Sequence, residues 1–230
     1  CSPSPPLWPA WRMPRWVLMG RVVLAFSGGL EDGVALLGFV NHSVSHVTGS
    51  VSLFAEGIAT GNLHRATQTG LIVLFFFLGS VLSGFLIRHE SLKMGRRYGV
   101  ALAIESGLLF LATYLFYQHS FSGELAASMA CGLQNALVAT YSGSAIRTTH
   151  LTGIVSDLGA EIGYALRGSR FNQKQFQLQL SIFVGFLAGG VMGAWMFDWI
   201  GYSAFLVPAT IVLLASGIYS LMHNRQIKVA

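Results

Sequence analysis

The sequence predicts an all-α integral membrane protein, and three observations lead to this fold class. Of the 230 residues, 53% are hydrophobic and only 10% are charged, whereas soluble domains carry about a quarter charged residues. The apolar residues form long runs separated by short basic loops, which is typical of a polytopic helical membrane protein. Alternating, strand-like patterns are almost absent, and only helices or closed barrels satisfy their backbone hydrogen bonds in lipid. We therefore expect bilayer-crossing helices.

Six apolar segments each approach the ~20 residues that cross a hydrocarbon core. These spans lie at about 20–41, 67–87, 99–118, 124–142, 177–197 and 203–223. The segment 1–19 is rich in Pro and Trp and lacks the apolar run of a signal peptide, so we expect a disordered or interfacial tail in which Met13 is a candidate start. Residues 20–230 form the predicted membrane domain.

The basic residues predict the topology. With the N-terminus inside, 13 of the 14 Lys and Arg residues lie on the cytoplasmic side and only Arg65 lies outside. This bias predicts a multi-pass protein of a bacterial inner membrane with both termini in the cytoplasm. The net charge of +5 is explained by these loops, so we expect the lipid bilayer, and no nucleic acid, as the partner.

The two halves of the chain repeat each other. Three landmarks recur in the same order, with a spacing that increases slowly along the chain: Gly29-Leu30-Glu31-Asp32 with Gly132-Leu133-Gln134-Asn135, His46-Val47-Thr48-Gly49 with His150-Leu151-Thr152-Gly153, and Phe77 to Gly84 with Phe186 to Gly193. Each copy, at about 20–120 and 124–223, holds three spans. An odd number makes the second copy enter the membrane from the opposite face, which predicts two inverted three-helix repeats, as in many secondary transporters.

Small residues are concentrated in the second and fifth spans. Gly79, Ser80, Ser83 and Gly84 lie in one, and four glycines between Gly185 and Gly193 lie in the other. Small side chains let helix backbones approach closely in lipid, so close packing is the first interpretation and a pore lining the second. We expect these two spans to cross each other near the pseudo-twofold axis.

Acidic residues inside the spans are candidates for function, because a charge at membrane depth costs at least ~2.5–3.5 kcal/mol. Glu31 and Asp32 lie in the first span, and Asp32 aligns with Asn135, which suggests one proton-responsive and one neutral side of a site. The alternative for the pair is a structural contact, for example with Arg147. Glu105 is either a proton-linked residue or a neutral, hydrogen-bonded core group, and it aligns with the apolar run near Pro208.

The repeated His-x-Thr-Gly phrases predict two short half-helices, after the first and fourth spans. Thr48 is a good N-cap residue, and a helix start offers free N–H groups and partial positive charge to an anion. Ordinary capped loops are the alternative. The candidate binding residues are Asp32, Asn135, Thr48, Gly49, Thr152, Gly153, Gln134 and Arg147, with His46 and His150 as weaker candidates.

Catalytic and metal signatures are missing from the sequence. Cys1 and Cys131 have no disulfide or metal-ligand spacing, and the spacing of His42, His46 and His64 makes a poor metal site. No catalytic motif is present either. We expect no metal, no cofactor and no enzyme activity.

Some of these motifs resemble a known family. The Gly28 to Asp32 segment followed by Thr48-Gly49, and the run from Gly132 to Ala136 followed by Thr148 to Gly153, look like the two halves of the YoaK family of bacterial inner-membrane proteins. The similarity covers roughly residues 20–225. That family is a domain of unknown function, so the resemblance implies six helices and a bacterial membrane.

The resulting functional prediction is proton-linked movement of a small polar or anionic solute through a site between the repeats. Two alternatives stay open: a membrane enzyme acting on a lipid-linked substrate, and a non-catalytic scaffold. A homodimer is compatible with the small size, but nothing in the sequence requires one. The substrate, the direction and the coupling ion are left open.

Overall fold

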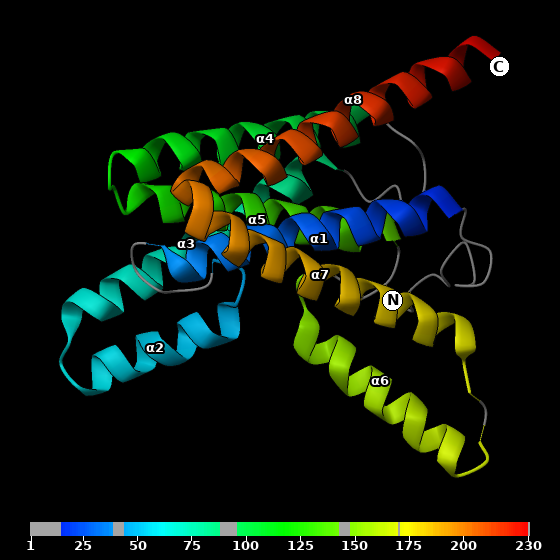
Figure 1. The fold of residues 1–230 in the computed structure, drawn as a ribbon, viewed down its shortest axis with the longest axis horizontal. Coiled ribbons are helices and arrows are strands. Elements are labelled where there is room, and N and C mark those ends of the chain that lie inside the picture. The colour runs from blue at the N-terminus through cyan, green and yellow to red at the C-terminus, as the bar shows by residue number, and fades with distance from the viewer. Residues whose placement is uncertain (1–14, 39–43, 88–95, 143–147, 170, 230) are drawn as a thin grey trace.

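The computed structural model describes residues 15–38, 44–87, 96–142, 148–169 and 171–229, and every regular element in these ranges is helical (Figure 1). This confirms the predicted all-α class. In chain order the elements are α1 (Arg15–Leu37), α2 (Val47–Ala59), α3 (Leu63–Leu86), α4 (Arg96–Tyr117), α5 (Ser122–Ser142), α6 (Leu151–Leu166), α7 (Gln173–Ile200), the 3₁₀ helix η2 (Gly201–Phe205) and α8 (Leu206–Val229).

The six long helices occupy the six predicted apolar segments to within a few residues, and α2 and α6 are the two short helices expected after the first and fourth of them. Residues 15–19, which we expected in the tail, belong to α1.

Three stretches of the described residues are long and apolar enough to cross a membrane. They are α3, residues 97–117 of α4, and the continuous run from Gln173 to Leu221 that contains α7, η2 and most of α8. Helix α1 contains Arg21, Glu31 and Asp32, and α5 contains Glu124, which lowers their hydropathy.

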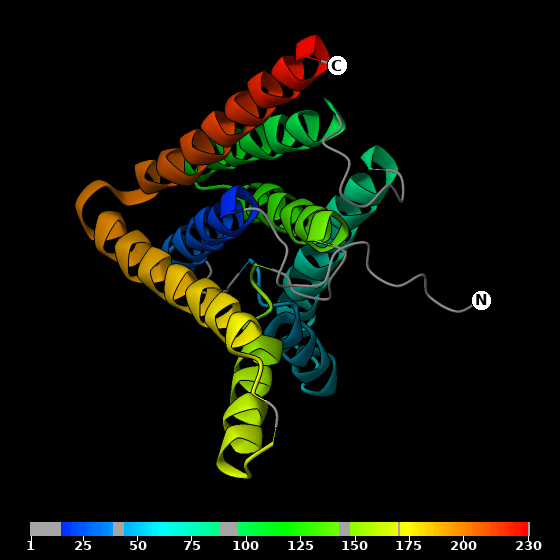
Figure 2. The same cartoon turned by 90° about the vertical axis from the view of Figure 1, so that its right-hand side faces the viewer.

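The two more polar helices, α1 and α5, lie inside the molecule. Figure 2 shows them surrounded by α3, α4, α7 and α8, while α2 and α6 project from one side of the bundle. Most side chains of α1 and α5 in the described ranges are buried, among them the fully buried Leu30 and Leu133. The outer helices therefore shield the polar inner helices from the surroundings.

Glycine allows the closest helix crossings. A Cβ on Gly29 of α1 would lie 2.1 Å from the carbonyl oxygen of Phe186 in α7, and a Cβ on Gly132 of α5 would lie 2.0 Å from that of Phe76 in α3. The return contacts are as close, because a Cβ on Gly189 or Gly79 would meet a backbone carbonyl at 2.0 Å. No side chain larger than hydrogen fits at such distances.

These crossings correct one expectation. The small residues of α3 and α7 do not bring those two helices together in the described residues: α7 packs along α1, and α3 packs along α5. The reason is that the matching glycines lie on α1 and α5, so each small-residue stripe meets a stripe in the other half of the chain. The crossings also make Phe76, and not Phe77, the counterpart of Phe186, which shifts the sequence match by one position.

Helices α4 and α8 join through two equivalent hydrogen bonds. The Ser106 hydroxyl donates to the carbonyl oxygen of Ala209 at 2.8 Å, and the Ser216 hydroxyl donates to that of Gly99 at 2.7 Å. The two bonds are related by one common spacing, which carries Ser106 onto Ser216 and Gly99 onto Ala209. This spacing aligns Glu105 with Ala215, and not with the apolar run near Pro208 as the sequence suggested.

Candidate functional site

The short helices α2 and α6 both begin in the middle of the molecule. Their starts lie close to one another in both views, and the two helices run apart from there (Figures 1 and 2). The N-cap residues are His46 (φ −87°, ψ 71°) and His150 (φ −85°, ψ 61°), so the two starts have nearly the same backbone conformation. Neither side chain makes a capping hydrogen bond.

This arrangement corrects the expected caps. Thr48 and Thr152 are not N-cap residues, because each helix begins one residue before its threonine. Thr48, Gly49 and Thr152 are exposed, and Gly153 is half-buried. Each threonine carbonyl accepts a hydrogen bond from a serine one turn later, Ser52 or Ser156. The threonine and glycine residues therefore form the outer part of the first turn.

Asp32 holds the start of α2. Its side chain is buried in α1, and one carboxylate oxygen accepts the backbone N–H of Ser45 at 3.2 Å. The other oxygen lies 3.3 Å from Nε2 of His46. The His46 ring also stacks on Phe186 of α7, with 6.5 Å between centroids and 17° between planes. The candidate we considered weaker, His46, thus directly contacts the candidate we favoured.

Asn135 holds the start of α6 in the same way. Its side-chain oxygen accepts the backbone N–H of Thr149 at 3.3 Å, and the Thr148 hydroxyl lies 3.4 Å from the same atom. Its amide nitrogen donates to the Thr149 hydroxyl at 2.6 Å. The start of α6 therefore has a neutral hydrogen-bonded cluster where the start of α2 has a carboxylate and an imidazole.

Glu31 and Gln134 lie at the contact of α1 with α5. The Glu31 carboxylate accepts hydrogen bonds from the Ser27 hydroxyl and the Cys131 thiol, both at 3.2 Å. Gln134 donates to the carbonyl oxygen of Leu24 at 3.0 Å, and its Oε1 lies 3.5 Å from the position of a Cβ on Gly28. The repeated sequence aligns Gly28 with Cys131. Glu31 of α1 contacts Cys131 of α5, and Gln134 of α5 lies against Gly28 of α1, so the two side chains reach equivalent positions on each other's helix.

Glu105 differs from these acids. It is fully buried in α4, and neither carboxylate oxygen has a hydrogen-bond partner within the described residues. Both interpretations of Glu105, a proton-linked residue and a neutral core group, therefore stay open. Arg147, the remaining candidate, lies outside the described residues.

Several contact residues were missed by sequence reasoning, among them Ser45, Thr149 and Phe186. Ser45 and Thr149 directly precede the two repeated histidines, and extending the repeat by one residue would have found them. Phe186 was identified only as a landmark of the repeat. Its stacking on His46 depends on how α7 crosses α1, which no local pattern encodes.

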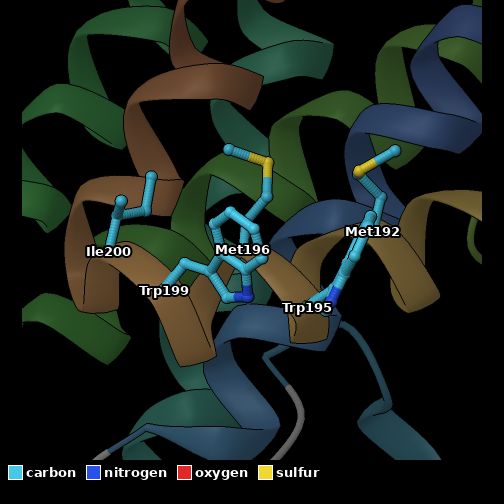
Figure 3. A pocket seen from close by; sticks show the side chains of 5 residues that line it. All are labelled: Met192, Trp195, Met196, Trp199 and Ile200. Atoms are coloured by element: carbon cyan, nitrogen blue, oxygen red, sulfur yellow. The ribbon is translucent and has the colours of Figure 1, made fainter.

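A separate groove on α7 has a different chemistry. Its volume is about 210 Å³, and its lining side chains are all apolar or aromatic (Figure 3): Met192, Trp195, Met196, Trp199 and Ile200. No candidate site residue lines it. Across the described ranges, no three His, Cys, Asp or Glu residues gather in a way that could hold a metal ion.

Fold and site together define an all-helical protein with membrane-compatible helices and buried acidic side chains. The chain belongs to the family described as protein of unknown function (DUF1275), whose model matches residues 21–218. The YoaK family is part of this family, so the predicted resemblance is confirmed. No curated protein matches the chain, and no solved structure does.

Proposed function

We propose that this protein is a small secondary-transporter-like carrier of a bacterial inner membrane, with both termini in the cytoplasm, that moves a small polar or anionic solute in a proton-linked manner. Its proposed architecture is two inverted repeats, the first containing α1–α4 and the second α5–α8. Equivalent residues in the two halves make matching contacts, which supports this division. The equivalent pairs are Asp32 and Asn135, Gly29 and Gly132, and Ser106 and Ser216.

The single observation that carries the proposal is the convergence of two helix starts on a pair of buried polar side chains. The first turn of a helix leaves backbone N–H groups without intrahelical partners, and its partial positive charge favours an anion. Helices α2 and α6 begin near each other, each tied down by Asp32 or Asn135. Two helix ends that approach from opposite directions are the arrangement in which broken helices of transporters bind solutes.

The proposed proton linkage comes from the chemical difference between the start of α2 and the start of α6. Asp32 and His46 are both titratable groups, whereas Asn135 and Thr149 are neutral. A proton gained or lost at the Asp32–His46 contact changes the charge that a solute meets at the start of α2 and leaves the start of α6 unchanged. Buried acids of this kind are typical of proton relays in transporters.

A flux measurement in liposomes tests this function. Purified protein is reconstituted with a trapped pH-sensitive dye, and a panel of small carboxylates, inorganic anions and amino acids is applied across a pH gradient. We expect at least one solute to dissipate the gradient, and Asp32→Asn to abolish the coupling. Ser181→Ala, which removes an exposed hydroxyl bonded within α7, serves as the matched control. No flux of any solute, together with a silent Asp32→Asn, contradicts the proposal.

A second candidate function is favoured by one contact. His46 lies beside the Asp32 carboxylate and its side chain is 49% exposed, as a general base of a membrane enzyme acting on a lipid-linked substrate would be. Incubating the protein with a total lipid extract and following the products by mass spectrometry tests this. A product that disappears with His46→Gln favours the enzyme over the carrier. A third alternative, a scaffold, predicts that both substitutions are silent.

A further inference from the structure

The two N-cap histidines occupy different places although their helices begin alike. The His46 ring reaches Asp32 and stacks on Phe186. The His150 ring instead lies back over its own helix, where Cε1 and Nδ1 are both 2.9 Å from the position of a Cβ on Gly153. Equivalent residues therefore show two different side-chain positions in one molecule.

The contacts of the neighbouring hydroxyl groups differ in step with the positions of the two histidines. In the second repeat, where His150 is folded back, the Thr149 hydroxyl takes the contact with Asn135 at 2.6 Å. In the first repeat His46 contacts Asp32, and the Ser45 hydroxyl is buried without a hydrogen-bond partner in the described residues. A buried hydroxyl without a partner is costly. The arrangement in the second repeat shows which atom would satisfy it: the Asp32 oxygen that His46 now contacts.

Glycine provides room for the second position in both repeats. The ring of His150 lies where a side chain at position 153 would be, so any residue other than Gly there would have to displace the ring. At Gly49 the same space is open, because the nearest atom to the position of a Cβ there is Cβ of His46 at 4.0 Å. Gly disfavours a helix, and nothing in the present contacts of Gly49 requires it.

We propose that His46 exchanges between two positions: the contact with Asp32 and Phe186, and a position folded over Gly49 in which the Ser45 hydroxyl donates to Asp32. This inference rests on the proposed function, since it identifies a side chain of the first repeat that moves during transport. The folded position uncovers the start of α2 for a solute, and the contact with Asp32 covers it. His46 is thus a gate of the candidate site.

Histidine NMR on the full chain in lipid nanodiscs tests the exchange without any solute. The chain contains seven histidines, and the signal of His46 is assigned by its loss in His46→Gln. In the native protein we expect two environments for His46, seen as two signals or as exchange broadening. Gly49→Ala places a methyl group in the folded position and leaves the contact with Asp32 free, so we expect only that environment to remain. Ser45→Ala removes the replacement donor and shifts the population in the same direction.

Two matched variants complete the test. Gly163→Ala, at an exposed position of α6 with no neighbour within 4 Å, is expected to change nothing, and Gly153→Ala is expected to shift the signal of His150 and not that of His46. A single environment for His46 that Gly49→Ala and Ser45→Ala leave unchanged overturns the inference. Flux measured on the same preparations separates the two proposals: flux without exchange overturns the gate alone, and exchange without flux overturns transport alone.

Discussion

Asp32 and Asn135 make the same backbone contact in the two halves of the chain: each accepts the N–H of the residue that precedes an N-cap histidine, Ser45 at 3.2 Å and Thr149 at 3.3 Å. One carboxylate oxygen or one amide oxygen is sufficient for this bond. The second polar atom of each side chain is then available for a different partner. A shared structural role and a divergent chemical role thus coexist at this pair of positions.

Substitutions at Asp32 should separate these roles. Asp32→Asn keeps an oxygen for the Ser45 N–H and removes the carboxylate beside His46, so we expect a folded protein that has lost its pH coupling. Asp32→Ala leaves the buried N–H unpaired, which costs about 1–3 kcal/mol. Thermal unfolding in detergent, followed by circular dichroism, measures the difference between the two variants. Equal unfolding temperatures for Asn and Ala at this position would show that the backbone contact contributes nothing.

The crossing of α1 with α7 should be intolerant of a single methyl group. A Cβ on Gly29 would lie 2.1 Å from a backbone carbonyl oxygen, and backbone cannot move aside as a flexible side chain can. We expect Gly29→Ala to cost more than the roughly 1–3 kcal/mol that is typical of overpacking. Gly84→Ala is the control, because a Cβ there would have no atom within 4 Å. The unfolding temperature of each variant decides the matter, and similar values for both would contradict the crossing.

Much of the fold was predictable because hydropathy and repetition can both be read directly from the sequence. The positions of the long helices follow from the apolar runs, and α2 and α6 follow from the repeated His-x-Thr-Gly phrases. The helix partners were not predictable. The glycines of α3 fit any helix with a matching stripe, and the sequence does not say that Gly79 meets Met129 of α5.

The site was predictable in part for the same reason. Asp32 and Asn135 could be chosen because a charge in an apolar segment is expensive and because they align. The contact of His46 with Asp32 was not foreseen, since it depends on where the start of α2 lies relative to α1, which no local sequence pattern encodes. The Thr48 cap was wrong because the helix begins one residue earlier than the best capping residue.

The hydrogen bonds of Ser106 and Ser216 should contribute equally to stability. Each hydroxyl reaches one carbonyl oxygen across the contact of α4 with α8, at 2.8 and 2.7 Å. Removing one such bond costs about 0.5–1.5 kcal/mol. The two bonds share no partner, so we expect the effects of Ser106→Ala and Ser216→Ala to add in the double variant. Unfolding temperatures of the two single variants and the double variant measure this, with Ser181→Ala as the control whose hydroxyl bonds within its own helix.

Cys131 should stabilise the contact of α1 with α5 through its hydrogen bond to Glu31, and its thiol can also be labelled to detect when that contact opens. Its thiol is fully buried and donates to Glu31 at 3.2 Å. Glu31 accepts hydrogen bonds from Cys131 and from Ser27. Cys131→Ser supplies another donor at the same place, whereas Cys131→Ala removes one of these two bonds and keeps only that from Ser27. We expect the serine variant to be closer to the native protein, and the alanine variant to lose about 1–3 kcal/mol, the range for a buried group that loses a partner.

The same thiol provides the measurement. In a Cys1→Ser background, a thiol-reactive dye should label the folded protein slowly, because Cys131 has no exposed surface, and should label it rapidly once α1 and α5 separate. The labelling rate against temperature then gives the midpoint at which this central contact opens. Circular dichroism provides the midpoints of the serine and alanine variants, which lack the thiol. Rapid labelling at low temperature, or an alanine variant as stable as the serine variant, would show that the thiol does not support Glu31.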